Sequence, residues 1–199
     1  MNEVNYDKLM QELMKGAAGK KLLLHSCCAP CSSHCLTELK SVFRVTVLYF
    51  NPNLDSREEY ERRKGEQIRF LKETGYADLL DCDYSPEEFE VVAAGLEGEK
   101  EGGARCKKCF ELRLRRTAEE ARKGGYDCFA TTLTVSPLKN ARLINEIGFA
   151  LEQEYGVKYL PSDFKKRGGY LHSIELSKQY DLYRQTYCGC VYSKTNGLV

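Results

Sequence analysis

The stretch Lys21-Leu-Leu-Leu-His-Ser26 runs directly into Cys27-Cys28-Ala-Pro-Cys31, and this junction decides the fold. A short apolar run of this kind is typical of a buried strand, and helical periodicity follows it. Four further runs predict strands, at residues 44–50, 78–82, 127–132 and 157–160. Because helical segments separate these strands, we expect an α/β fold with a parallel, doubly wound sheet and right-handed crossovers.

Capping signals predict where several of the intervening helices begin and end. One helix is expected from Ser56 to Gly75, a second from Ser85-Pro86, a third over 106–123, and a fourth from Ser136-Pro137 to Gly156. Residues 1–199 are therefore expected to form a single α/β domain. Its parts are an N-terminal helix within 1–20, a sheet core over 21–162 and a C-terminal extension over 163–199.

Composition excludes several classes of protein. Hydrophobic residues make up 42% of the 199-residue chain and charged residues 30%, which is typical of a soluble globular protein. No apolar run is long enough to span a membrane, and the acidic start of the chain does not resemble a signal peptide. We therefore expect a cytoplasmic protein without a membrane partner. Ten cysteines in such a chain indicate metal or redox chemistry rather than a disulfide scaffold.

The first cysteine group follows the first strand. Ligands of open α/β sheets bind at the carboxyl ends of the strands, and a helix N-terminus lowers the pKa of a nearby thiol. The adjacent side chains of Cys27 and Cys28 can both bind one large metal cluster, because such a cluster has several iron atoms that accept thiolate ligands. A four-coordinate zinc ion is the alternative, although zinc more often uses the Cys-x-x-Cys spacing.

The second group is Cys106-Lys-Lys-Cys109. Its i, i+3 spacing at the start of a helix places both sulfurs on one face. Together with Cys27 and Cys28 it completes four thiolates, the ligand set of a [4Fe–4S] cluster. A structural zinc site remains open at this point.

The third group is Cys188-Gly189-Cys190, near the C-terminus. A disulfide across a single residue is strained, and strained disulfides are the labile, catalytic kind. This motif therefore predicts a two-electron relay, with extra metal ligands or free thiols as the alternatives. By contrast, Cys82 and Cys128 lie within strands and are interpreted as core residues, as is His25.

One acidic residue is a candidate for hard-metal ligation. Asp83 follows the strand over 78–82, so it is expected at the same sheet edge as Cys27. Its carboxylate would supply an oxygen ligand to a second iron.

Charge is unevenly distributed although the net charge is only +1. Residues 76–101 hold nine acidic residues and one lysine, whereas residues 105–125 hold eight basic residues and three glutamates. Two interpretations remain open: solvated helix faces, or a basic helix that contacts a polyanion such as RNA. The candidate contacts are Arg105, Lys107, Lys108 and Arg113.

Taken together, the motifs resemble those of the cobalamin-independent, QueH-type epoxyqueuosine reductases. The resemblance extends from residue 21 to about residue 193, and its blocks are Leu24–Cys31, Tyr49–Asn53, Arg105–Leu114, Thr131–Pro137 and Tyr183–Cys190. It implies the reduction of the cyclopentane epoxide of epoxyqueuosine, at the wobble position of tRNA, to the alkene. The implied fold is similar to the adenine-nucleotide α-hydrolase (HUP-like) type, with the cysteine motif in place of the ATP-binding loop and a C-terminal Cys-Gly-Cys extension.

The resemblance also implies the cofactors and the partners. It implies a [4Fe–4S] cluster on Cys27, Cys28, Cys106 and Cys109, a redox-active disulfide between Cys188 and Cys190, and no cobalamin. Cys31 and Asp83 lie where a second iron would be held. The implied partners are tRNA carrying epoxyqueuosine and an electron donor that no motif identifies.

Two other functions stay open from the sequence. Cys28-Ala-Pro-Cys31 is similar to a thioredoxin-like thiol site, but that function leaves the other cysteines unexplained. A zinc-stabilised RNA-binding module explains the basic helix but not the Cys-Gly-Cys motif. The glycine-rich loops of dinucleotide-binding and P-loop proteins are absent from the sequence.

Overall fold

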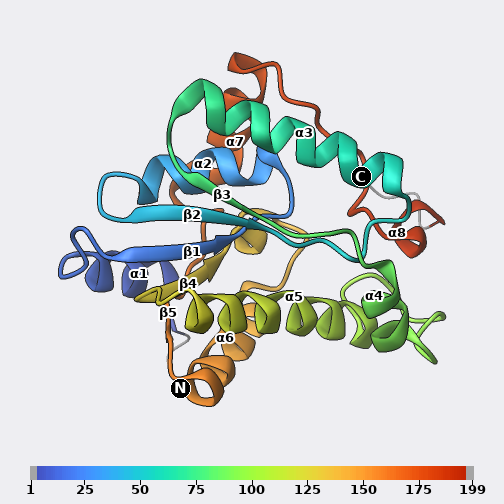
Figure 1. Ribbon diagram of the computed structural model, residues 1–199. Coiled ribbons are helices and arrows are strands. Elements are labelled where there is room, and N and C mark those ends of the chain that lie inside the picture. Colours follow the sequence, from blue (N-terminus) through green and yellow to red (C-terminus); the bar gives the residue numbers. More distant parts are fainter. Residues whose placement is uncertain (1–3, 196–199) are drawn as a thin grey trace.

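Five parallel strands form the centre of the protein, in the order β3-β2-β1-β4-β5. The structure is a computed structural model, and it describes residues 4–195. The strands are β1 (Lys21–His25), β2 (Arg44–Tyr49), β3 (Asp78–Asp81), β4 (Cys128–Thr131) and β5 (Lys158–Tyr159). Each lies within its predicted range, and the parallel, doubly wound sheet is confirmed (Figure 1).

The central strand β1 is apolar along most of its length because both of its faces are covered. Leu22 and Leu24 are fully buried in one hydrophobic cluster, whereas Leu23 is fully buried in another on the opposite face. Successive side chains of a strand point to opposite faces. An uninterrupted apolar run is therefore what a central parallel strand requires.

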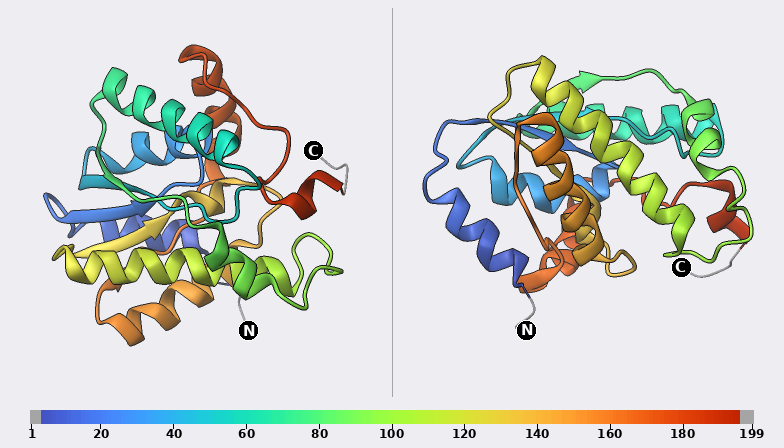
Figure 2. Two further views of the ribbon diagram at one scale, coloured as in Figure 1. Left: turned by 45° about the vertical axis from the view of Figure 1, so that its right-hand side comes forward. Right: turned by 90° about the horizontal axis from the view of Figure 1, so that it is seen from below.

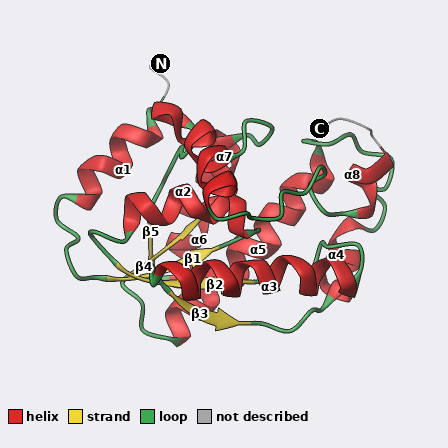
Figure 3. Ribbon diagram, turned by 90° about the horizontal axis from the view of Figure 1, so that it is seen from above, coloured by secondary structure: helices red, strands yellow, loops and turns green. Residues whose placement is uncertain are grey.

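Helices cover both faces of the sheet. The helices of the described residues are α1 (Tyr6–Met14), α2 (Ala29–Leu39), α3 (Arg57–Thr74), α4 (Pro86–Ala93), α5 (Ala104–Lys123), α6 (Ala141–Tyr155), α7 (Gly169–Gln179) and α8 (Val191–Thr195). Helices α2 and α3 lie on one face and α5 and α6 on the other, as two further views also show (Figure 2). Viewed from above, α7 crosses the end of α2 (Figure 3). No helix within residues 4–195 is both long and apolar enough to cross a membrane.

Capping residues explain one helix that was predicted well and one that was not. Helix α3 begins where expected, since the Ser56 side chain accepts a hydrogen bond from the Glu59 N–H at 3.2 Å. The prediction of a helix from Ser136-Pro137 was wrong. There α6 begins later, because the Asn140 side chain accepts from the Leu143 N–H at 3.1 Å and forms the N-cap.

The chain after α7 returns across the molecule and is held there by α3. The Arg69 guanidinium donates to the carbonyl oxygens of Tyr180 and Asp181 at 3.0 and 2.9 Å, and the Glu66 carboxylate accepts from the Tyr183 N–H at 2.9 Å. These contacts lead residues 184–190 to the carboxyl end of the sheet, where α4 and α8 also lie (Figure 1). The division of residues 1–199 into one domain with an extension stays a prediction, because it includes residues outside the described range.

Candidate functional site

Three cysteines form a tight group where β1 ends and α2 begins. Cys28 is the N-cap of α2, and the Sγ atoms of Cys27, Cys28 and Cys31 all lie within 4.8 Å of one another. The group is composed entirely of thiols, and within residues 4–195 it is the only set of three or more potential metal ligands so close together. Soft ligands of this kind select zinc, copper(I) or iron–sulfur clusters.

The environment of Cys27 favours its thiolate. Hydrogen bonding from the Cys28 and Cys31 thiols, followed by the charge of Lys139, holds the pKa of Cys27 well below its usual range, against the opposing effect of burial. The Thr132 hydroxyl lies 3.6 Å from the Cys27 Sγ and contributes in the same direction. Within this group the thiolate is therefore favoured at Cys27, with the Cys28 and Cys31 thiols as its hydrogen-bond donors.

The pKa values of the two neighbouring thiols, Cys28 and Cys31, are raised rather than lowered. Hydrogen bonding to Cys27 raises the pKa of Cys28 to about 12 and raises the pKa of Cys31 well above its usual value. The Gln185 side-chain amide donates to the Cys28 Sγ at 2.9 Å. This contact links the C-terminal segment directly to the cysteine group.

A second cysteine group lies at the start of α5. Cys106 and Cys109 occupy successive turns of this helix, and the Gly102 N–H donates to the Cys106 Sγ at 3.2 Å. Both line a small cavity of about 30 Å³. Cys188 and Cys190 line the same cavity, so the structure brings the second and third sequence motifs together.

The Cys-Gly-Cys motif is a tight loop whose thiols are both free. Gly189 has φ +121°, and a Cβ atom there would lie 2.4 Å from a methyl group of Leu54. The Gly189 carbonyl accepts from the Asp55 N–H at 2.9 Å, and the Cys188 carbonyl accepts from the Arg63 guanidinium at 3.3 Å. The loop is thus held by the segment that follows β2 and by α3.

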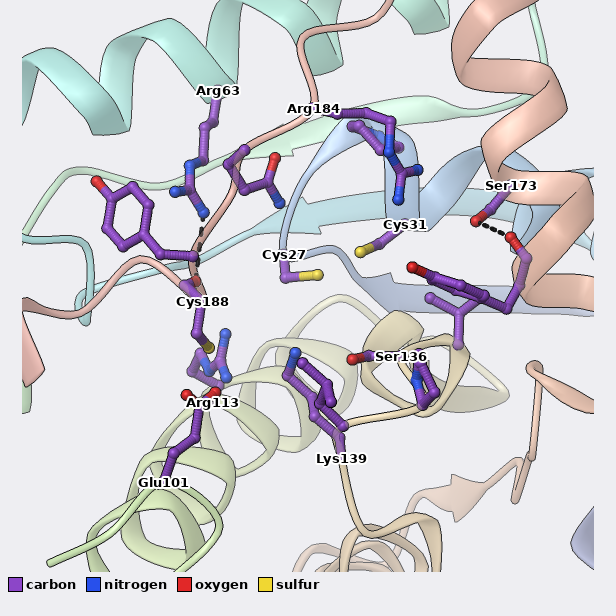
Figure 4. Close-up of a pocket in the computed structure, with 17 residues that line it drawn as sticks. Cys27, Cys31, Arg63, Glu101, Arg113, Ser136, Lys139, Ser173, Arg184 and Cys188 are labelled. Atoms are coloured by element: carbon purple, nitrogen blue, oxygen red, sulfur yellow. Dashed lines mark hydrogen bonds between the residues drawn. The ribbon is translucent and has the colours of Figure 1, made fainter. Parts of the chain in front are cut away.

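A larger cavity of about 270 Å³ adjoins the small one. Cys27, Cys31 and Cys188 line it, and Arg113 and Lys139 line both cavities. Figure 4 shows these side chains around the cavity, with Cys27 and Cys31 on one side of it and Cys188 and Arg113 on another. The four cysteines predicted as cluster ligands are therefore split between two groups. Cys27 and the pair Cys106 and Cys109 line adjoining cavities, and the charged residues Glu101, Arg113 and Lys139 line both.

Some predicted site residues lie elsewhere. Asp83 is exposed and lines neither cavity, so the structure does not bring it to Cys31. His25 is fully buried as a core residue; its ring nitrogens lie 3.0 Å from the Thr131 hydroxyl and 3.1 Å from the Phe50 carbonyl. Burial, reinforced by the charge of Arg113, lowers the pKa of His25 to about 3, so the ring is neutral.

The basic helix α5 presents only part of its charge to the surface. Lys107 and Lys108 are exposed, whereas Arg105 and Arg113 are each 2% exposed. Arg105 donates to the carbonyl oxygens of Leu96, Glu97 and Glu99 and so fixes the loop that precedes α5. Contacts between this end of α5 and phosphates would therefore depend on the two lysines.

Three further residues belong to the site: Lys139 and Arg63 carry no recognisable sequence signal, and Gln185 lies in the motif block Tyr183–Cys190 without a role that the motif assigns. Lys139 lies in an irregular turn before α6, and Arg63 lies among many charged residues of α3, where it is only 2% exposed and pairs with Glu59 at 2.6 Å. Gln185 is near Cys28 only because residues 180–188 fold back across the sheet edge. In each case the tertiary structure, not the local pattern, places the side chain in the site.

Comparison with protein families gives one match over most of the chain. A family model described as epoxyqueuosine reductase QueH matches residues 22–196. The chain is 44% identical over 200 residues to an epoxyqueuosine reductase QueH of Streptococcus pyogenes serotype M1, with 96% of this chain and 78% of the relative covered. It is 39% identical over 175 residues to a protein of the same description from Thermotoga maritima, with 86% and 89% covered.

Comparison with solved structures supports the fold. The U34-tRNA thiolase NcsA from Methanococcus maripaludis, solved with its [4Fe-4S] cluster, superposes with a TM-score of 0.58 at 13% identity, over 94% of this chain and 67% of the thiolase. At this identity the likeness concerns the fold alone. Together with the parallel strand order, it confirms the fold class expected from the sequence.

Proposed function

The chain belongs to the epoxyqueuosine reductase QueH family, and from this premise we propose how its cysteines and buried cations carry out the family's reaction. The protein is an oxidoreductase that reduces epoxyqueuosine in tRNA to queuosine. The observation that carries the proposal is the grouping of Cys27, Cys28 and Cys31 at the carboxyl end of β1. The cavity that Cys27 and Cys31 line adjoins the one that Cys106 and Cys109 line, and Cys188 lines both.

The reaction sets the requirements of the site. Conversion of the epoxide to an alkene breaks both carbon–oxygen bonds of the three-membered ring and releases the oxygen as water. It consumes two electrons and two protons. The site must therefore deliver electrons, hold the departing oxygen and supply protons to it.

The residues present fit an iron–sulfur cluster. The ligating atoms are soft thiols, and one of them is already favoured as a thiolate. Of the three charged side chains that line both cavities, Arg113 and Lys139 are cations that suit an anionic group, and Glu101 is a carboxylate. When bound, such a cluster supplies single electrons and a Lewis-acidic iron.

We assign Cys27, Cys28, Cys106 and Cys109 as the ligands of a [4Fe–4S] cluster. Support comes from Cys27, which lines the larger cavity, and from Cys106 and Cys109, which line the small one, because Arg113 and Lys139 line both. A second iron at Cys31 and Asp83 remains a prediction, to which the exposed position of Asp83 adds no support. The absence of cobalamin is likewise proposed from the family resemblance.

Cys188 and Cys190 are proposed to form a redox-active pair. Cys188 lines both cavities and so is near Cys106 and Cys109 as well as the larger space that would receive the substrate. Oxidation of the two thiols to a disulfide would release two electrons and two protons, the amounts that one turnover consumes. The donor that re-reduces the pair has no recognisable site in the described residues.

Lys139 is the residue we propose to hold the oxygen of the epoxide. This partly buried side chain lines the cavity beside Cys27, Cys31 and Cys188. The charges of these thiols raise the pKa of Lys139, although desolvation acts against this. The group therefore remains charged. A charged donor that points into the substrate cavity stabilises the negative charge that develops on the departing oxygen.

The substrate would enter from the tRNA as a single nucleoside. A cavity of about 270 Å³ beside the thiols suits a base that has been moved out of its stack. Exposed Lys107 and Lys108 would contact phosphates near the entrance. A tRNA-modifying enzyme without a membrane-spanning helix among its described residues is proposed to act in the cytoplasm.

The test combines turnover on tRNA carrying epoxyqueuosine with iron analysis of anaerobically purified variants. Cys106→Ser should lose iron together with turnover, whereas Cys188→Ser should lose turnover and keep its iron. Cys128→Ser is the matched control, because this buried cysteine lies at the start of β4, away from the cavities. Loss of the cluster from Cys188→Ser would make this residue a ligand instead.

A further inference from the structure

Arg113 is a buried cation that forms no ion pair with a carboxylate among residues 4–195, although Glu101 lines the same two cavities. Its side chain is 2% exposed, and it takes part in none of the ion pairs within 4.0 Å that the described residues form. Burial of an unpaired charge costs several kcal/mol, so buried arginines are normally paired. The buried guanidinium of Arg113 therefore requires a negatively charged group nearby.

Hydrogen bonds hold the guanidinium in place but leave part of it unused. Nη1 donates to the Asn51 side-chain oxygen at 3.3 Å, and Nε donates to the Cys109 carbonyl at 3.4 Å. Asn51 is itself fixed, since its amide donates to the Ser26 carbonyl at 2.9 Å. Nη2 is buried and has no hydrogen-bond partner. Two donors therefore orient the group, and the third is free for an acceptor that residues 4–195 do not supply.

The surroundings of Arg113 indicate what that acceptor is. Arg113 lines both cavities, and the ionisable groups that favour its charge are the thiols of Cys109, Cys188, Cys27 and Cys190. Both cysteine groups thus contribute neighbours to one guanidinium. A single anion bound between the two groups would satisfy Nη2 and neutralise the buried charge.

We propose that Arg113 is a positioning residue that donates a hydrogen bond from Nη2 to the iron–sulfur cluster and raises its reduction potential. This inference rests on the proposed function, which supplies the cluster. A nearby cation stabilises the reduced, more negative form more than the oxidised form, and hydrogen bonds to cluster sulfurs act in the same direction. Arg113 therefore serves the electron transfer and not the binding of tRNA.

The first experiment measures the midpoint potential of the cluster-loaded protein by a spectroscopically monitored redox titration. Arg113→Gln should shift the midpoint to a more negative value, and Arg113→Lys should shift it less. Arg116→Gln is the matched control on the same helix, where Arg116 pairs with Glu120 at 2.9 Å on the outside of the molecule. An Arg113→Gln protein with full iron content and the wild-type midpoint would overturn the inference.

A second measurement does not depend on the stability of Arg113→Gln. Wild-type protein labelled with ¹⁵N-arginine should show a ¹⁵N hyperfine coupling to the reduced cluster in pulsed EPR, and this coupling should disappear in Arg113→Lys. Absence of the coupling in the wild type, or its persistence in Arg113→Lys, would refute the proposed contact. Failure of the proposed function is distinguishable, because wild-type protein would then hold no cluster in the first place.

Discussion

Gly189 separates the two C-terminal thiols with a backbone conformation that other residues rarely adopt. Its φ is +121°, and a Cβ atom would lie 2.4 Å from Leu54 and 3.0 Å from the Arg63 guanidinium. Both the backbone and the packing therefore require glycine at this position. The glycine between the two cysteines is therefore needed for the loop to pack against Leu54 and against Arg63 of α3.

Substitution of Gly189 by alanine should lower the free energy of unfolding by about 1–3 kcal/mol. Denaturant titration of the metal-free, reduced protein measures this loss. Gly16→Ala is the matched control, since a Cβ atom there meets nothing within 4 Å. Equal stability of the two variants would mean that the loop rearranges without cost.

Lys139 is the second residue whose role can be tested alone. Lys139→Met removes the charged donor but keeps most of the side-chain volume, so turnover should fall by about 10²-fold or more while the iron content stays unchanged. A single-turnover assay on tRNA carrying epoxyqueuosine measures the effect. Lys72→Met, at an exposed position of α3, serves as the control. Wild-type turnover in Lys139→Met would exclude a role in holding the oxygen.

At the scale of elements, α2 and α7 meet through a histidine pair. The Nδ1 atoms of His34 and His172 lie 3.0 Å apart, so one ring must donate and the other accept. Burial lowers the pKa of His34, assisted by the charges of His172 and Arg167 and opposed by that of Glu38. The contact is therefore made by at least one neutral ring.

This arrangement makes stability depend on pH in a defined direction. The folded protein binds a proton at His34 less readily than the unfolded chain, so the free energy of unfolding should fall as the pH drops below about 6.5. Urea denaturation at about pH 7.5 and pH 5.5 should show a larger loss for the wild type than for His34→Gln, which cannot titrate there. An identical loss in both proteins would assign the pH dependence to other groups.

The N-terminal end of helix α5 should contribute to RNA binding through Lys107 and Lys108, which are its exposed basic residues. The double variant Lys107→Gln, Lys108→Gln should bind tRNA more weakly and reduce the slope of log affinity against log salt by roughly one to two units. Lys15→Gln, which changes the exposed lysine at the C-cap of α1, is the control. An unchanged slope would place the phosphate contacts on another surface.

The elements also show which structural features local patterns specify. The strands were predictable because Leu22, Leu23 and Leu24 form an apolar run that only a doubly covered strand explains, and α3 because Ser56 and Gly75 cap its two ends. The start of α6 was not predictable, because the sequence offers two signals for a helix start, Ser136-Pro137 and Asn140. Only Asn140 makes the capping hydrogen bond.

At the scale of the whole molecule, the candidate site is assembled from distant segments. The sequence motifs identified the cysteines and the sheet edge at which Cys27 lies. They did not show that Cys188 and Cys190 lie beside Cys106 and Cys109, because contacts of α3 with residues 180–188 determine that proximity. The burial of Arg63 and Arg113 was not predictable either. Each arginine lies in a helix that is rich in surface charge, so the local sequence gives no sign that its side chain is buried.

The most direct test of the account is iron and acid-labile sulfide analysis of the anaerobically purified wild-type protein, followed by turnover on tRNA carrying epoxyqueuosine. The wild-type protein should contain about four irons and four sulfides per chain, and it should convert the epoxide to the alkene. A protein that contains zinc instead, or that reduces the substrate without iron and sulfide, would contradict the account.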